Sequence, residues 1–281
     1  MPAPASEPQV VASLHATGTA AAPAAERRRL WQAAIKWPMY AVAVMPVLLA
    51  AGWRFGRGEP VRLDQLLLFL LAAVLLLAWE NLANDVFDAD TGVDTLGKPH
   101  SVVNLTGRRG AVAALANACL VVGLALMAVV AWRSTAAVLG LVLACCGLGY
   151  LYQGPPFRLG YRGLGEPLCW LAFGPLATSA GLLALAPAGA SAVPWRTALE
   201  LGSGPALATT LVLFCSHFHQ VGEDAANGKR SPVVHLGTGT AAAWCPGSWP
   251  QRSLSSGHRC WWVSGRCRPC WERSVCHRRA S

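Results

Sequence analysis

An acidic stretch at the exit of the second long apolar segment carries the strongest chemical signal in the sequence. If that segment continues as a helix, Asn81, Asp85 and Asp88 fall on one face, because residues three or four apart lie one above the other. Asp90 and Asp94 are expected to follow in the loop. An acidic loop between two spans can be merely solvated. Carboxylates that enter a membrane segment are costly, however, and usually serve a function, so we interpret this stretch as part of a site.

A second polar cluster stands where the sixth apolar segment ends. On a continuous helix His217, Gln220 and Asp224 would share one face, and His219 and Glu223 would share another. Such a stretch can be an ordinary juxtamembrane segment. Both clusters nevertheless follow even-numbered segments, so six spans would bring them out on the same side of the membrane. We predict that they meet there.

Basic residues follow each acidic cluster: Lys98 after the first, and Lys229 and Arg230 after the second. This combination suits Mg²⁺ and a diphosphate, because Mg²⁺ is usually held by one or two carboxylates together with substrate phosphates. A carboxylate and a phosphate ~4 Å apart repel each other by roughly 4 kcal/mol at an effective dielectric constant of ~20. The aspartates therefore need a metal before they accept a diphosphate, and the basic side chains would complement the remaining phosphate charge.

Two tyrosines, Tyr150 and Tyr152, lie in a third stretch, which follows the fourth apolar segment and ends at Arg162. Aromatic residues at a membrane boundary are often interfacial anchors. The alternative is catalytic, because a tyrosine ring stabilises a nearby cation by roughly 0.5–2 kcal/mol. The sequence leaves both interpretations open.

The elements that must position these residues are apolar. Of the 281 residues, 54% are apolar and 13% are charged, against ~25% charged residues in an average soluble domain. This composition excludes disorder as the main state, collagen-like repeats and a highly charged nucleic-acid binder. Six segments approach the ~20 residues that cross a bilayer, and their lack of alternation favours helices over barrel strands. They run over residues 37–53, 63–82, 111–132, 135–151, 168–190 and 199–218.

The basic residues predict the orientation of these spans. If the N-terminus is cytoplasmic, eleven of the sixteen lysines and arginines before residue 239 fall inside and five fall outside. Cytoplasmic loops carry an excess of lysine and arginine. We therefore expect both polar clusters to face the cytoplasm.

Composition divides the chain into three regions. Residues 1–28 are rich in alanine and proline and are predicted to form a disordered extension, whereas 29–238 contain the six spans and form the membrane domain. The tail, 239–281, holds five of the ten cysteines and five of the twelve tryptophans, without an apolar run near ~20 residues. We expect this tail not to fold.

Two interpretations of the tail stay open. Its abrupt change of composition is typical of a shifted reading frame in a GC-rich gene. The chain would then lack part of a helical wall and be poorly active or inactive. Alternatively, Cys267 and Cys270 have the spacing of zinc ligands, and Cys260, Cys276 and His277 lie nearby.

The strings that contain these residues resemble the UbiA superfamily of intramembrane prenyltransferases. Asn84-Asp85-Val86-Phe87-Asp88, followed by Asp94, is similar to the first aspartate-rich motif of that family. The wider strings over 84–107, 161–168 and 214–220 resemble the phylloquinone branch of the MenA-type enzymes, which are the 2-carboxy-1,4-naphthoquinone phytyltransferases of cyanobacteria and plastids. The likeness covers residues 29–238.

The resemblance implies an all-helical membrane bundle of about nine spans, of which this chain retains six. It also implies Mg²⁺-dependent transfer of a phytyl or related prenyl group from its diphosphate to a naphthoquinoid acid, with loss of the carboxyl group. The implied metal ligands are Asp85, Asp88, Asp94 and Asp224, joined by Gln220, which replaces an aspartate of the second motif, and by Glu223. The implied diphosphate-binding residues are Asn84, Lys98, Lys229 and Arg230. The candidate catalytic residues are Asp85, Asp88, Asp224, Tyr150 and Tyr152.

Other functions stay open at this point. Homogentisate phytyltransferase and chlorophyll synthase belong to the same superfamily and differ in acceptor. An ion transporter or a structural membrane subunit represents a different class, because carboxylates at helix ends also occur in transporters. The expected surroundings are membrane lipid and no nucleic acid. The membrane would be a cyanobacterial plasma or thylakoid membrane, or a plastid membrane.

Overall fold

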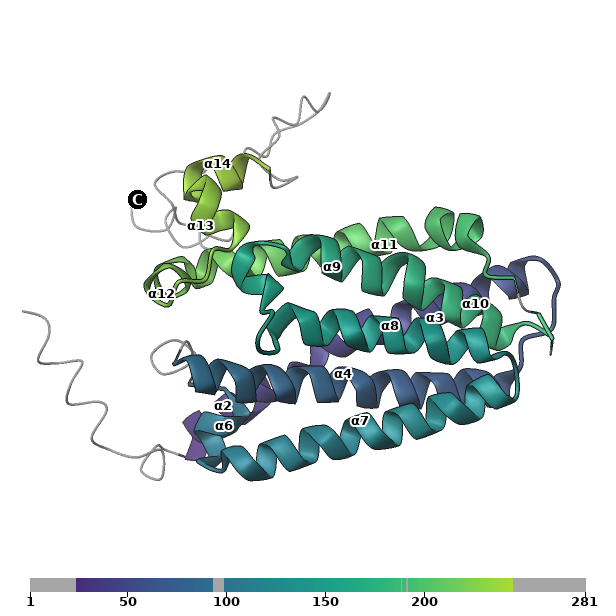
Figure 1. Ribbon diagram of the computed structural model, residues 1–281, viewed down its shortest axis with the longest axis horizontal. Coiled ribbons are helices and arrows are strands. Elements are labelled where there is room, and N and C mark those ends of the chain that lie inside the picture. Colours follow the sequence, from purple (N-terminus) through teal and green to yellow (C-terminus); the bar gives the residue numbers. More distant parts are fainter. Residues whose placement is uncertain (1–23, 93–98, 188, 191, 245–281) are drawn as a thin grey trace, which may run out of the picture. The chain divides into compact units, whose positions relative to one another are not determined.

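The computed structural model describes residues 24–92, 99–187, 189–190 and 192–244. This part of the chain is helical and contains no strand (Figure 1). The elements are α2 (Ala24–Ile35), α3 (Trp37–Gly56), α4 (Leu63–Thr91), α6 (Val102–Thr106), α7 (Arg109–Trp132), α8 (Ala136–Gln153), η2 (Leu159–Arg162), α9 (Gly165–Leu171), η3 (Ala172–Leu176), α10 (Ala177–Leu185), α11 (Trp195–Ser216), η4 (His217–His219), α12 (Val221–Ala226), α13 (Pro232–Leu236) and α14 (Thr238–Ala243).

Within the residues that the structure describes, six stretches of helix are long and apolar enough to cross a membrane, which confirms the predicted number and the all-helical class. Each overlaps one of the apolar segments of the sequence. They are Ala24–Gly56, Leu63–Thr91, Arg109–Trp132, Ala136–Gln153, Gly165–Leu185 and Trp195–His219. The chain is therefore a multi-pass membrane protein.

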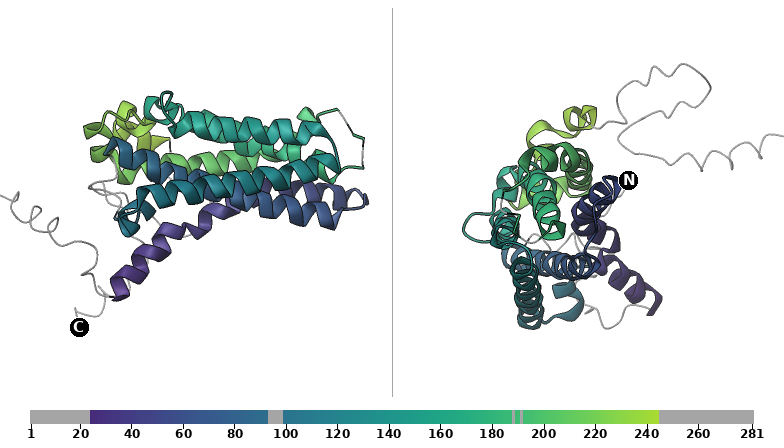
Figure 2. Two further views of the ribbon diagram at one scale, coloured as in Figure 1. Left: turned by 60° about the horizontal axis from the view of Figure 1, so that its bottom comes forward. Right: turned by 90° about the vertical axis from the view of Figure 1, so that its right-hand side faces the viewer.

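The first stretch of helix is divided at Lys36. This residue has a left-handed backbone (φ 53°), and Pro38 follows it in the first turn of α3. Proline suits the start of a helix because its missing N–H would be unpaired there anyway. The break turns α2 away from the bundle (Figure 2) and leaves Lys36 at the start of the first apolar helix.

Helix α4 carries the first acidic stretch. It spans 29 residues and ends at Gly92, whose positive φ of 78° is the conformation that glycine adopts without a Cβ clash. Helix therefore continues nine residues beyond the predicted end of the second span. The expectation that Asp90 lies in the loop is wrong: Asp90 is in the last turn of α4, where its carboxylate accepts hydrogen bonds from Arg109 at the start of α7.

The helices enclose an apolar core. Helix α4 packs along α7, α10 packs against α3 and α8, and α11 packs against α9 and η3. Gln65 is fully buried in this core, and its Nε2 donates to the carbonyl oxygens of Val130 (3.0 Å) and Ala184 (3.4 Å). One side chain of α4 thus links α4 to α7 and α10.

The outer faces of the long helices remain apolar. Leu67, Val121 and Leu207 are each at least 60% exposed. Large apolar side chains that point outward are suited to contact with lipid. The helices themselves are also suited to lipid, because their backbone polar groups are paired within the segment. The exposed apolar surface therefore agrees with a membrane location.

Two predicted region boundaries fall inside helices. Helix α2 begins at Ala24, within the segment expected to be disordered up to residue 28, and α14 covers residues 239–243 of the predicted unfolded tail. The cysteines considered as zinc ligands lie outside the described residues. Helices α6 and α12–α14 gather at one end of the bundle (Figure 1).

Glycine sets the close approach of α11 to the fifth span. A Cβ on Gly202 would lie 2.5 Å from Thr178 Oγ1 and 2.9 Å from the carbonyl oxygen of Gly174. We expect Gly202→Ala to destabilise the protein by roughly 1–3 kcal/mol, because overpacking forces the helices apart. Thermal unfolding in detergent measures this change.

Gly204→Ala is the matched control. It lies on the same helix, and a Cβ there has no neighbour within 4 Å. This variant should be as stable as the unchanged protein or slightly more stable, because alanine favours helix over glycine. Equal unfolding temperatures for the two variants would contradict the packing interpretation.

Candidate functional site

A cavity of about 460 Å³ runs from the polar end of the bundle into its apolar interior. Polar side chains from distant segments line its outer end, among them Lys36, Asp88, Tyr161, His217 and Lys229. The inner part is lined by apolar residues, among them Phe69, Met127, Val142, Ala177 and Leu213. A polar mouth on an apolar pocket suits a ligand with a charged head and a hydrocarbon tail.

Asp85 is held by two groups at this mouth. Its carboxylate is 1% exposed, with Oδ1 3.3 Å from Lys36 Nζ, and Oδ2 accepts a 2.8 Å hydrogen bond from the backbone N–H of Val102. Val102 is the first residue of α6, where backbone N–H groups have no partner within the helix. Helix α6 and the break at Lys36 therefore fix the position of this carboxylate.

Asp88 lies one turn further along α4 and is 4% exposed. The Tyr161 hydroxyl donates a 3.0 Å hydrogen bond to Asp88 Oδ1, and the Thr91 hydroxyl lies 3.0 Å from the same tyrosine oxygen. Burial raises the pKa of Tyr161 to about 12, and the neighbouring Asp88 charge adds to this rise. Tyr161 thus stays a hydrogen-bond donor over the physiological pH range.

Asp224 belongs to the second cluster and is fully buried. Its oxygens lie 3.2 Å from Lys229 Nζ and 3.5 Å from His217 Nδ1, while His217 Nε2 lies 3.4 Å from Glu166. Burial alone would raise the pKa of the Asp224 carboxyl. The contacts with His217 and Lys229 outweigh burial and hold this pKa below its usual value. Asp224 is therefore ionised at neutral pH.

The two acidic clusters meet through Tyr161. The hydroxyl of this residue contacts Asp88, and Lys229 Nζ lies 5.8 Å from the centre of its ring, within the range of a cation–π contact. Its backbone carbonyl also accepts a 2.7 Å hydrogen bond from the N–H of Arg230. The loop before α9 thus connects the end of α4 with the segment after α12.

The structure separates the sequence-predicted residues into three groups. Asn84, Asp88, Tyr152, Gln220 and Lys229 line the cavity, with Asp85 and Asp224 directly behind it through their ion pairs. Residues that do not line it are Tyr150, Glu223 and Arg230. Tyr150 is 39% exposed, and its hydroxyl donates to the carbonyl of Pro155 (2.6 Å). Asp94 and Lys98 lie outside the described residues.

The second cluster is not one continuous helix, contrary to expectation. Helix α11 ends at Ser216, η4 follows, and α12 starts only at Val221. Gln220, between them, has a non-helical backbone (φ −121°). His217 and Asp224 are in contact, as a shared helix face would predict. The contact arises because the break between α11 and α12 turns the two side chains toward each other.

The UbiA prenyltransferase family model matches residues 39–250. The chain belongs to the UbiA prenyltransferase family. Two similar relatives are a 2-carboxy-1,4-naphthoquinone phytyltransferase from Synechocystis sp. (46% identical over 212 residues) and a chloroplastic 2-carboxy-1,4-naphthoquinone phytyltransferase from Arabidopsis thaliana (43% identical over 218 residues).

The similarity to these relatives covers part of each protein. It takes in 75% of this chain in both cases, but 67% of the Synechocystis protein and 56% of the Arabidopsis protein. No solved structure is significantly similar to this chain. Membership of the UbiA family makes the chain a prenyltransferase, whereas the transferred group and the acceptor need a separate argument.

Magnesium is consistent with the donor set of this UbiA site. Within the described residues, no group of three or more histidine, cysteine or acidic side chains is close enough to hold a metal alone. Mg²⁺ needs no such cage, because one or two carboxylates plus substrate phosphates and water complete its coordination. Asp88 faces the cavity directly, and the two other buried carboxylates, Asp85 and Asp224, each touch a lysine that lines it. These oxygens fit a metal that arrives with a diphosphate.

Sequence reasoning missed four residues of the site, namely Lys36, Tyr161, Glu166 and His100. Lys36 is a lone basic residue before the first span, and sequence analysis used it only for orientation. Tyr161 lies in the same stretch as the two tyrosines that were singled out. Each of these residues contacts or faces groups far away in the chain, which local spacing does not predict.

We expect Lys229→Met to lower the unfolding temperature at pH 7, since removing one partner of a buried ion pair costs up to about 3–5 kcal/mol. The lowered pKa of Asp224 means that its stabilising contribution is present above the unfolded value of ~3.9 and is lost as pH falls through the folded value. Without Lys229 the buried charge is poorly compensated, so acid should relieve the defect. The temperature gap between variant and unchanged protein should therefore shrink between pH 7 and pH 4.

Arg162→Met is the control for this experiment. It also removes one positive charge, but Arg162 is exposed and makes no ion pair with the described residues. Its unfolding temperature should follow that of the unchanged protein at every pH. A gap for Lys229→Met that is constant with pH would contradict the role of Asp224.

Proposed function

We propose that this chain transfers a phytyl group from its diphosphate to 2-carboxy-1,4-naphthoquinone, or to the reduced form 1,4-dihydroxy-2-naphthoate, with loss of carbon dioxide. The supporting observation is the junction of two buried carboxylate clusters at the polar mouth of one apolar cavity. The names of the two relatives support the phytyl donor and the naphthoquinoid acceptor. The product would belong to phylloquinone or menaquinone synthesis.

The diphosphate would bind at the mouth, together with Mg²⁺. Asp85, Asp88 and Asp224 would hold the metal, with Gln220 as a neutral oxygen ligand; Asp94 and Glu223 remain proposed ligands on the strength of the resemblance. Bound Mg²⁺ would neutralise the diphosphate and make it a better leaving group. Asn84 lines the cavity one turn before Asp88, in reach of the same region.

Two lysine–aspartate pairs prepare the mouth for this ligand. Lys36 neutralises Asp85 and Lys229 neutralises Asp224 in the absence of metal. Once the aspartates bind a metal, each ammonium group is available to a phosphate oxygen at the same place. Arg230 and Lys98 would add positive charge around the mouth. Both lysines would thus have an anionic partner with and without the ligand.

The apolar interior has two roles in this reaction. It accommodates the long hydrocarbon chain of the donor, and it keeps water away from the allylic cation that forms when the C–O bond to the diphosphate breaks. A carbon of the acceptor ring then bonds to the cation, and its carboxylate leaves as carbon dioxide, so charge and electrons balance. Tyr152 lines the cavity between mouth and interior, where its ring would stabilise the cation.

The proposed setting is the cytoplasmic side of a cyanobacterial or plastid membrane. The excess of basic residues at the end of the bundle that carries the mouth supports this orientation. A site at the membrane boundary also gives a water-soluble diphosphate and a lipid chain access to one cavity.

One assay tests the acceptor and the donor together. Membranes that contain the full chain are incubated with phytyl diphosphate, Mg²⁺ and a panel of aromatic acceptors, which includes homogentisate and a chlorophyllide. Mass spectrometry should detect a phytylated, decarboxylated naphthoquinoid product and release of diphosphate. Transfer to another acceptor would reassign the substrate, and metal-dependent ion flux without any transfer would favour a transporter.

We expect Asp88→Asn to reduce transfer by at least about 100-fold, because carboxylate-held metal supplies several kcal/mol of charge stabilisation in such sites. Chelation of Mg²⁺ should abolish transfer in the unchanged protein. Both effects are measured as the rate of diphosphate release in the assay above.

Asp90→Asn provides the matched control for this loss. Asp90 lies two residues from Asp88 on the same helix, but its carboxylate pairs with Arg109 at the surface and does not line the cavity. Its variant should keep activity within about twofold, in line with the small energy of exposed ion pairs. Equal losses for the two variants would argue against a specific role for Asp88.

A further inference from the structure

Glu80 is a carboxylate inside the cavity that the proposed metal chemistry does not use. It lies on α4, four residues before Asn84 and eight before Asp88, and all three line the cavity. Four residues of helix rise by roughly 6 Å, so Glu80 lies about 12 Å deeper along the helix than Asp88. The helix thus presents a polar line that leads from the mouth into the apolar interior.

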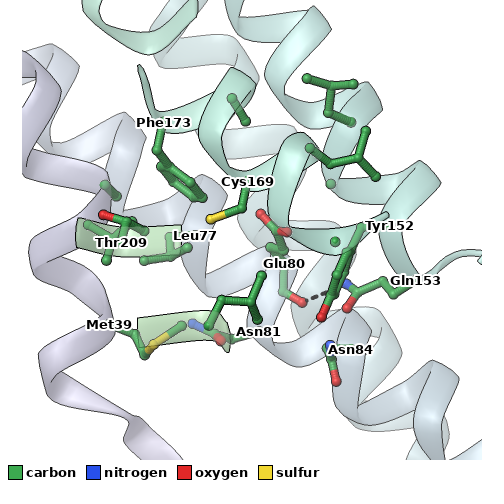
Figure 3. Close-up of a pocket in the computed structure, with 18 of the residues that line it drawn as sticks. Met39, Leu77, Glu80, Asn81, Asn84, Tyr152, Gln153, Cys169, Phe173 and Thr209 are labelled. Atoms are coloured by element: carbon green, nitrogen blue, oxygen red, sulfur yellow. Dashed lines mark hydrogen bonds between the residues drawn. The ribbon is translucent and has the colours of Figure 1, made fainter. Parts of the chain in front are cut away.

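The carboxylate of Glu80 has no partner among the described residues. Asp85, Asp88 and Asp224 each contact a donor, and Glu166 pairs with His217. The hydrogen bond from Gln153 Nε2 (2.9 Å) goes to the backbone carbonyl of Glu80 and not to its carboxylate (Figure 3). Burying a polar group without a hydrogen-bond partner destabilises a protein by several kcal/mol. Ionisable side chains within membrane spans are therefore usually kept for a function.

Aromatic and apolar side chains surround Glu80 in the cavity. Figure 3 shows it between Cys169 and Tyr152, with Phe173 and Leu77 on the neighbouring walls. Gly149 makes room for it, because a Cβ there would lie 3.0 Å from Glu80 Oε1. Tyr152 is seated by two further close approaches, since a Cβ on Gly160 or Gly165 would lie within 2.7 Å of its ring.

We propose that Glu80 binds the aromatic acceptor by a hydrogen bond between its carboxyl group and a ring oxygen. This inference rests on the proposed function and assigns a residue to its acceptor. The reacting carbon of the donor is bonded to the diphosphate at the mouth, and the acceptor ring must approach it to about 3–3.5 Å. In the bound acceptor, the ring oxygen beside the reacting carbon would point inward, to the turn of α4 that carries Glu80. A hydroxyl or quinone oxygen of the acceptor would supply the partner that the described residues do not.

Glu80→Leu and Glu80→Gln test the proposal in the purified full chain. The leucine removes the hydrogen bond, so the KM for the naphthoquinoid acceptor should rise at least about tenfold, whereas the KM for phytyl diphosphate should change by less than twofold. The glutamine keeps an acceptor and a donor and should restore the acceptor KM to within about threefold. Calorimetric titration with the acceptor alone measures the same loss of affinity without turnover.

Gly149→Ala offers an independent test that leaves the carboxyl group intact. The added methyl would displace the end of the Glu80 side chain, which is flexible, so folding should be little affected. Acceptor KM should rise selectively here too. Thermal unfolding of each variant, with and without phytyl diphosphate, checks that the protein folds and binds the donor.

The outcomes separate this proposal from the proposed function. If the unchanged protein uses the naphthoquinoid acid and Glu80→Leu retains its acceptor KM, the assignment of Glu80 is wrong and the function stands. Equal increases in both KM values would show a merely structural role and would also overturn it. If the unchanged protein uses another aromatic acceptor, the function is wrong, and Glu80 is judged on that acceptor. Binding of no aromatic acceptor would overturn both.

Discussion

Three buried carboxylates at the edge of an apolar bundle impose the main physical constraint on this molecule. Like charges in a low-dielectric environment repel one another strongly and are costly to desolvate. The chain solves this problem with cations and donors from elsewhere in the sequence: Lys36 for Asp85, Tyr161 for Asp88, and Lys229 with His217 for Asp224. Each of these contacts involves a residue at an irregular part of the backbone: Lys36 between α2 and α3, Tyr161 in η2, and His217 in η4. The irregular backbone at this end of the bundle thus places the partners of the charges.

The apolar remainder of the bundle depends less on individual contacts. Among the described residues, its helices pack through small residues and two buried glutamines, Gln65 and Gln153, and their outer faces require only lipid. Specific chemistry is thereby confined to one end and to the cavity that opens from it. This division matches a substrate with a charged head and a long hydrocarbon chain, because the two ends of such a molecule need opposite surroundings.

The sequence predicts the regular parts of this structure well and the tertiary pairs poorly. The number of spans, the helical class and the meeting of the two polar clusters follow from apolar segment lengths and from parity. The partner of Asp88 is 73 residues away, and that of Asp85 is 49 residues away. No local pattern indicates such pairs.

Errors in the predicted helix ends have the same origin. Apolarity stops at Leu82, but α4 continues to Thr91, since Arg109 pairs with Asp90 and Gly92 ends the helix. The sequence also does not indicate which of Tyr150 and Tyr152 faces the cavity. Two residues apart on α8, they lie about 200° apart around the helix axis, so one ring points toward Pro155 and the other into the cavity.

Tyr161 gives the mouth of the cavity a mechanical property. Its hydroxyl is tied to α4, its ring lies beside Lys229, and its carbonyl is tied to Arg230. A shift of this one residue moves Asp88 on one side of the mouth and Lys229 and Arg230 on the other, although these two sides lie far apart in the chain. Tyr161 therefore couples the two sides of the mouth mechanically. A displacement of one side around a ligand is transmitted to the other side through the contacts of this residue.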